Sequence, residues 1–265
     1  MRKEDTKIFY SDELNDDFGK FHISPNVYSG KKKAVIERKG LYNFCSNIFI
    51  YILFPLLILF GLLTGFRIKG RKNIKKVDKK QGYFIFSNHA GIYDVALNYT
   101  LCLPKRMDTV GYSGALDGWL LRRIVPFLGF IPLPVDFHDI PKFKHALKYY
   151  IVDKKQVVCI YPEAHLWPYY TGVRNFRRQS FRYPVELGVP IVPVFFARRK
   201  RKGLWRLFKR PRVTAIIGQP IYPDLTLSRV EATHKLGDEC YEALLKASKS
   251  IEQEEYWHYE YRPNK

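Results

Sequence analysis

The sequence is poor in cysteine, in methionine and in acidic side chains. Its 265 residues contain four cysteines and two methionines, and 25 acidic residues stand against 45 basic ones. No two cysteines have the CxxC spacing that zinc sites use. The isolated cysteines therefore predict buried, reduced thiols in a protein that faces the cytosol, and no metal site.

The shortage of acidic residues leaves a formal net charge of +20. A charge of this size predicts an anionic partner, which is a nucleic acid, an anionic membrane or an acidic carrier protein. The apolar content of 46% is ample for a core, and 265 residues suit one large domain or one domain with an appendage.

Charged side chains are also absent from residues 41–66, which are almost purely apolar from Ile48 to Leu63. This stretch is long enough to cross a membrane. Basic residues flank it on both sides, so the positive-inside rule places both ends on the cytoplasmic side. Pro55 would break or kink a helix. These features favour a re-entrant helix pair in one leaflet over a single span or a soluble core helix, and no signal-peptide layout precedes them.

The rest of the chain alternates short β-rich runs with helical patterns. Strands are predicted at residues 66–70, 83–88, 108–111, 129–134, 157–161, 191–196 and 213–217, and helices at 93–103, 116–126, 139–154, 181–187 and 228–252. This alternation predicts a single α/β domain with a largely parallel sheet flanked by helices. We therefore divide the chain into a polar, basic arm of low order (1–40), a membrane-associated helical segment (41–66) and one α/β domain (67–265).

The stretch from Tyr83 to Asp94 joins a buried strand to polar residues. Ligands of α/β sheets bind beyond the carboxyl ends of the strands, where His89 is expected. Asp94, in the first turn of the next helix, could then reach His89 Nδ1, fix the tautomer and leave Nε2 free to accept a proton. The spacing alone is a weak signal, because a structural histidine with Asp94 as a helix N-cap fits it too.

Four ordered blocks in the sequence resemble those of the glycerolipid acyltransferases, the family of the bacterial lysophosphatidate acyltransferases. NHAGIYD at 88–94 looks like the NHxxxxD box of that family, and LGFIP at 128–132 occupies the place of its second block. YPEA at 161–164 is similar to the FPEG block, and VPIVPV at 189–194 to the VPIVPV block. The resemblance covers about residues 66–221 and implies that His89 and Asp94 are the catalytic residues.

Two departures from the family pattern concern the acceptor. The arginines that usually hold its phosphate are missing after the second block and after Glu163, which is followed by Ala164 and His165. A phosphate needs a cationic clamp, preferably a guanidinium. Arg174, on the same loop as Glu163 and helped by Arg177 or Arg178, is predicted to replace the usual clamp. Asn88, Glu163, Arg174 and Arg177 are thus the expected substrate-binding residues.

The resemblance implies an O-acyltransferase of phospholipid biosynthesis, with a lysophosphatidate-type acceptor and with acyl-CoA or acyl carrier protein as the thioester donor. No further cofactor and no metal are expected. One alternative is an acyltransferase for a non-phosphate acceptor, and another is a non-catalytic membrane-binding protein with the same fold. The expected location is the cytoplasmic face of a membrane.

The segment from Arg198 to Arg212 mixes basic residues with Trp205, Phe208 and leucines. Such mixtures occur in nucleic-acid binding and in contacts with anionic membranes. The apolar segment at 41–66 favours the membrane, so no nucleic-acid partner is predicted.

Overall fold

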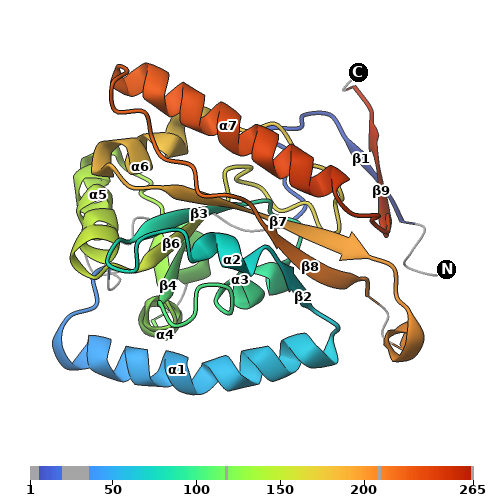
Figure 1. Cartoon of the computed structure of the whole chain (residues 1–265), viewed down its shortest axis with the longest axis horizontal. Helices are drawn as coiled ribbons and strands as arrows, with labels where there is room; N and C mark the ends of the chain where they lie inside the picture. Colours follow the sequence, from blue (N-terminus) through green and yellow to red (C-terminus); the bar gives the residue numbers. More distant parts are fainter. Residues whose placement is uncertain (1–5, 20–35, 117–118, 208–209, 264–265) are drawn as a thin grey trace.

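The protein is described here by a computed structural model that covers residues 6–19, 36–116, 119–207 and 210–263. A seven-stranded sheet in the order β2-β8-β7-β3-β6-β4-β5 forms its centre (Figure 1). Neighbouring strands are parallel except β7 and β8. The strands are β2 (Arg67–Lys69), β3 (Tyr83–Ser87), β4 (Met107–Gly111), β5 (Phe130–Pro132), β6 (Val157–Ile160), β7 (Ile191–Arg199) and β8 (Arg212–Ile217).

Helices cover both faces of this sheet (Figure 1). They are α2 (Arg71–Ile74), α3 (Ile92–Asn98), α4 (Leu121–Phe127), α5 (Ile140–Lys148), α6 (Arg182–Leu187) and α7 (Arg229–Lys249). Successive side chains of a strand point to opposite faces. Phe84 and Phe86 of β3 accordingly lie in the core under α5, α6 and α7, whereas Tyr83 and Ile85 lie in the core that includes Leu97 of α3. The predicted α/β domain with a mostly parallel sheet is confirmed.

The last helix shows how closely local signals match this fold. Ser228 and Glu231 form a capping box that begins α7, and each side chain accepts from the backbone of the other. Leu236, Cys240 and Leu244, which lie on one face of this helix, are buried in the core against the sheet.

The apolar helix α1 (Gly40–Leu63) is continuous, with Pro55 inside it, so the predicted broken helix pair is wrong. Its length and composition would let it cross a membrane. Only 22% of its most apolar window is buried within the protein, unlike the mostly buried core helix of a soluble protein. The buried residues Ser46, Ile50, Phe54 and Gly61 form one stripe along the helix. Packing on both sides of Pro55 keeps the helix in one piece.

Polar contacts attach α1 to the domain from end to end. Tyr42 donates to Arg123 O near its start, and Trp205 Nε1 donates to Leu63 O at its end. Just before the helix, Arg38 is buried and pairs with Asp108 of β4 at 2.5 Å. Arg38 is therefore a structural residue, although the sequence pattern placed it among the basic residues that flank a membrane segment.

The N-terminal residues contribute a strand that the sequence did not predict. β1 (Thr6–Tyr10) pairs in parallel with β9 (Trp257–Tyr261) at the other end of the chain. An aromatic group joins the pair to the domain, since Tyr259 stacks on Trp167 at 5.0 Å between ring centroids. The basic run at 31–33 lies outside the described residues, and the division at residues 40 and 66 stays a prediction.

Candidate active site

The carboxyl ends of β3, β6 and β7 meet at one edge of the sheet because the three strands are parallel neighbours. Asn88 and His89 follow β3, Glu163 follows β6, and Arg198 lies near the end of β7. Asp94 lies at the same edge, in the first turn of α3. Four of the predicted site residues, Asn88, His89, Asp94 and Glu163, therefore lie together. Arg198 belongs to the basic run at 198–212, for which the sequence predicts membrane contact.

Asn88 is buried and joins two strands. Its Oδ1 accepts from Phe196 N at 2.7 Å, and its Nδ2 donates to Phe196 O at 3.4 Å. These bonds hold the end of β3 against β7 and so fix the direction of the loop that carries His89. The sequence predicts that Asn88 contacts substrate, whereas in the structure its side chain binds the backbone of β7.

The His89 ring stacks on Tyr161, with the two ring centroids 4.4 Å apart. Its Nδ1 is buried and has no hydrogen-bond partner among the described residues. Desolvation lowers the pKa of His89 to about 4, and the charges of Arg174 and Arg198 act in the same direction, whereas Asp17 opposes them. His89 is therefore neutral at physiological pH, the form that a general base requires.

Asp94 is fully buried and pairs with Arg198 instead of His89. Its Oδ2 accepts from Arg198 Nη2 at 2.5 Å, while its Oδ1 is buried without a partner. Burial raises the pKa of Asp94 and the guanidinium opposes that effect. A Cβ on Gly91 would lie 2.8 Å from Arg198 Nη2, so a glycine leaves room for this pair. The predicted His89–Asp94 hydrogen bond is not formed in this structure.

Glu163 and Arg174 form a second buried pair, at 3.0 Å. Glu163 also accepts from His89 N at 3.2 Å and from Arg174 N at 3.1 Å. The Arg174 guanidinium lies 4.8 Å from the Trp167 ring centroid and donates to His165 O. Arg174 is 0% exposed. The pair consequently attaches the loop after β6 to the backbone of His89, and Arg174 lies in the interior.

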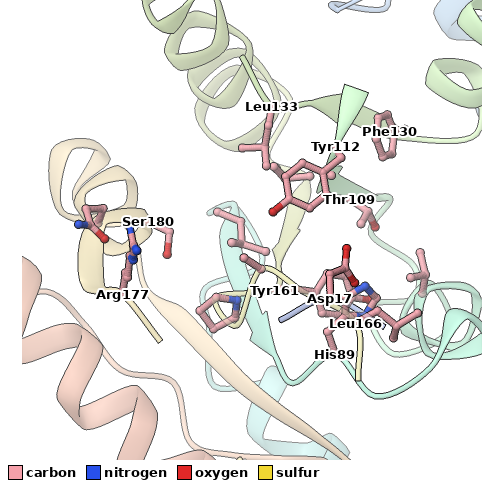
Figure 2. A pocket seen from close by; sticks show the side chains of 17 residues that line it. Asp17, His89, Thr109, Tyr112, Phe130, Leu133, Tyr161, Leu166, Arg177 and Ser180 are labelled. Atoms are coloured by element: carbon pink, nitrogen blue, oxygen red, sulfur yellow. The ribbon is translucent and has the colours of Figure 1, made fainter. Parts of the chain in front are cut away.

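A pocket of about 330 Å³ lies beside His89. Its wall is mostly apolar, from Val95, Val110, Phe130, Leu133, Ile160 and Leu166 among others. Figure 2 shows Arg177 and Ser180 on the side of the pocket that lies away from His89. Of the two arginines predicted to bind substrate, Arg177 therefore lines the pocket and Arg174 does not. Asp17, which no sequence signal indicated, lines it as well.

Within the described ranges, no group of three or more His, Cys, Asp or Glu side chains could hold a metal ion. The chemical groups in the pocket wall include a neutral imidazole, the Asp17 carboxylate and the exposed Arg177, and two buried acid–arginine pairs lie close to His89.

The fold and the site define an α/β protein with a partly buried histidine at a strand end and an apolar pocket beside it. The family model "Acyltransferase" matches residues 65–197, half of the chain, and the protein belongs to that family. All four sequence blocks lie inside the match, and the predicted family membership is confirmed.

Among solved structures, the chain is similar to the 1-acyl-sn-glycerophosphate (LPA) acyltransferase PlsC from Thermotoga maritima, with 14% identity and a TM-score of 0.48. The alignment covers 80% of this chain and 98% of that one. No curated protein matches the sequence significantly.

Proposed function

We propose that this acyltransferase moves a fatty acyl group from a thioester donor to the hydroxyl of a lysophosphatidate-type acceptor in phospholipid synthesis. The observation that carries the proposal is His89, a histidine with a lowered pKa that lines an apolar pocket at the end of β3. An apolar pocket suits an acyl chain, and the neutral imidazole suits removal of a hydroxyl proton.

In the proposed reaction, His89 takes the proton of the acceptor hydroxyl while the oxygen attacks the thioester carbonyl. The tetrahedral intermediate then expels the thiolate, which takes the proton back from the imidazolium, so that an ester and a free thiol result. The acceptor supplies the nucleophile, and no acyl–enzyme intermediate is needed.

Asp94 is proposed to orient His89 during this step. His89 Nδ1 and Asp94 Oδ1 are both buried and both lack a partner. Catalytic hydrogen bonds are often long in the absence of substrate and tighten in the reacting complex. Closure of the site over substrate would pair the two atoms, while Arg198 keeps Asp94 charged.

Arg177 is the cation that we propose for the acceptor's phosphate, because it lines the pocket. Arg174 instead holds Glu163 and thereby the His89 loop. One observation favours the alternative of a non-phosphate acceptor: the Asp17 carboxylate lines the same pocket and would repel a phosphate.

We propose that the protein lies on the cytoplasmic face of a membrane with α1 in the plane of one leaflet. α1 contacts the domain along its whole length, so a spanning helix would draw that face of the domain into the bilayer. Leu204 and Leu207 are 81% and 83% exposed. They lie near the end of α1, because Trp205 between them donates a hydrogen bond to Leu63 O. The net charge of +20 favours anionic lipid and an anionic donor such as acyl-CoA or acyl carrier protein.

The test is thioester consumption and product analysis with lysophosphatidate and monoacylglycerol offered separately. We expect the wild type to form the diacyl phosphate product, and the His89→Ala variant to be slower by about 10²- to 10⁴-fold. Exclusive use of monoacylglycerol would favour the non-phosphate alternative. No transfer to any acceptor, or full activity of a folded His89→Ala variant, would overturn the proposal.

A further inference from the structure

The N-terminal segment, residues 11–19, precedes the apolar helix in sequence and yet lies over the candidate site. Phe18 N donates to Leu166 O at 3.3 Å, and Trp167 Nε1 donates to Asp16 O at 2.8 Å. Asn175 N donates to the Glu13 carboxylate at 3.1 Å. The segment is therefore held by the loop that follows β6.

The loop after β6 is in turn hydrogen-bonded to the backbone of the NHxxxxD box at 88–94. Trp167 N donates to His89 O at 3.2 Å, and Tyr169 N donates to Ala90 O at 2.8 Å. The loop after β6 thus lies between the N-terminal segment and the His89 loop and is hydrogen-bonded to both. The N-terminal segment contributes Asp17 to the pocket that His89 also lines.

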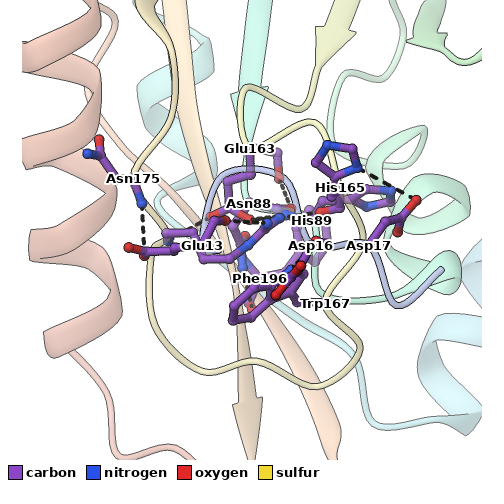
Figure 3. A network of polar contacts seen from close by, with 12 residues as sticks. Glu13, Asp16, Asp17, Asn88, His89, Glu163, His165, Trp167, Asn175 and Phe196 are labelled. Atoms are coloured by element: carbon purple, nitrogen blue, oxygen red, sulfur yellow. Dashed lines mark hydrogen bonds and ion pairs between the residues drawn. The ribbon is translucent and has the colours of Figure 1, made fainter. Parts of the chain in front are cut away.

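The direction of Asp17 is set by its neighbours. Asp16 Oδ2 accepts from Ser11 N at 2.7 Å and from Asp12 N at 3.0 Å, which closes a tight turn just before Asp17. Asp17 Oδ2 then lies 3.6 Å from His165 Nδ1, and Figure 3 shows this contact beside His89. A half-buried carboxylate thus lies beside the His165 imidazole and lines the same pocket as His89.

We propose that the N-terminal segment is part of the active site and that Asp17 is a positioning residue whose negative charge stabilises the imidazolium of His89 during acyl transfer. The charge of Asp94 is largely neutralised by Arg198, and that of Glu163 by Arg174. Asp17 has no arginine or lysine partner among the described residues, and the basic side chain that it contacts there is His165, at 3.6 Å. The inference rests on the proposed function, in which His89 accepts a proton.

The groups that surround His89 support this role. Desolvation has the largest effect and lowers the pKa of His89, the charges of Arg174, Arg198 and His165 lower it further, and Asp17 raises it. Tyr161 stacks on the ring, Glu163 accepts from the backbone N–H, and Asp94 is bound to Arg198. Removing the charge of Asp17 would therefore leave the imidazolium among cations with less compensation.

The test compares Asp17→Asn, which keeps the shape of the side chain, with Asp17→Glu and with Glu13→Gln. Glu13→Gln is the matched control, because it removes a charge from the same segment and keeps an oxygen for Asn175 N. His89 titration is followed by NMR on histidine-labelled full-length protein, with the signal assigned by its loss in His89→Ala.

We expect Asp17→Asn to lower the pH at which His89 titrates by about half a unit or more, and Glu13→Gln to leave it unchanged. In acyl-transfer assays, kcat of Asp17→Asn should fall about tenfold with less than about a threefold change in KM, and Asp17→Glu should restore part of it. Identical His89 titration in the wild type and Asp17→Asn would overturn the inference. Because the titration needs no turnover, its outcome is separate from failure of the proposed function, which inactivity of the wild type would show.

Discussion

Arg198 donates a 2.5 Å hydrogen bond to Asp94, and the side chains of both residues are buried, 5% and 0% exposed. The pair joins the end of β7 to the first turn of α3 across 104 positions of sequence. It brings a guanidinium to the carboxylate that the NHxxxxD box provides, and so sets the charge of the site.

Replacing Arg198 by methionine should destabilise the protein by about 3–5 kcal/mol, because a buried carboxylate would lose its cation. Asp94 would then become protonated at a higher pH than in the wild type, since burial already raises its pKa. Urea unfolding measures the loss. The double variant Arg198→Met/Asp94→Asn should lose less unfolding free energy than the two single variants lose together. Lys202→Met, on the exposed side of the same run, is the control, and an equal cost there would contradict the assignment.

The pH profile of kcat/KM should lack a step near pH 6.5, the ordinary range of a histidine. His89 has a pKa of about 4, so the base stays neutral from pH 8 down to about 5, and activity is lost only as the pH falls through about 4. Because the pKa of His89 is lower in the native state than in the unfolded state, the native state binds fewer protons between about pH 4 and pH 6.5. Stability due to His89 is then complete above about pH 6.5 and decreases below it. An activity midpoint near 6.5 would contradict this.

Arg174 and Arg177 should respond differently to replacement by alanine. Arg174→Ala breaks a buried ion pair and should cost about 3–5 kcal/mol of unfolding free energy. Arg177→Ala should leave stability nearly unchanged and raise KM for lysophosphatidate more than tenfold, or about 1.4 kcal/mol. Monoacylglycerol serves as the control acceptor. Equal losses of Arg177→Ala for the two acceptors would show that Arg177 does not bind the phosphate.

Exposed apolar residues of α1 should control membrane binding. Ile52 and Leu59 are 63% and 52% exposed, and burying each in lipid would contribute about 1.5–3 kcal/mol. Replacing both by serine should weaken binding to anionic vesicles at least tenfold in co-sedimentation. Leu225→Ser and Val230→Ser are the controls, because these residues are 65% and 68% exposed away from α1. Equal effects of the two pairs would contradict a membrane face on α1.

The sequence by itself determined the strands of the central sheet, their α/β alternation and the position of His89 at the end of one of them. Strands buried on both faces read as continuous apolar runs, and polar residues directly after such runs mark the binding edge of a parallel sheet. Hence β3, β6 and β7 and the residues that follow them could be predicted within a few positions. The capping box of α7 is equally local.

Only the tertiary structure decided which charges meet. Asp94 and Arg198 are 104 positions apart, β1 and β9 lie at opposite ends of the chain, and Asp17 reaches a loop that begins after residue 160. No local pattern encodes such contacts, because they arise only when the sheet brings remote loops to one edge. The continuity of α1 through Pro55 has the same origin: side-chain packing against the domain on both sides of the proline outweighs the local tendency of proline to end a helix.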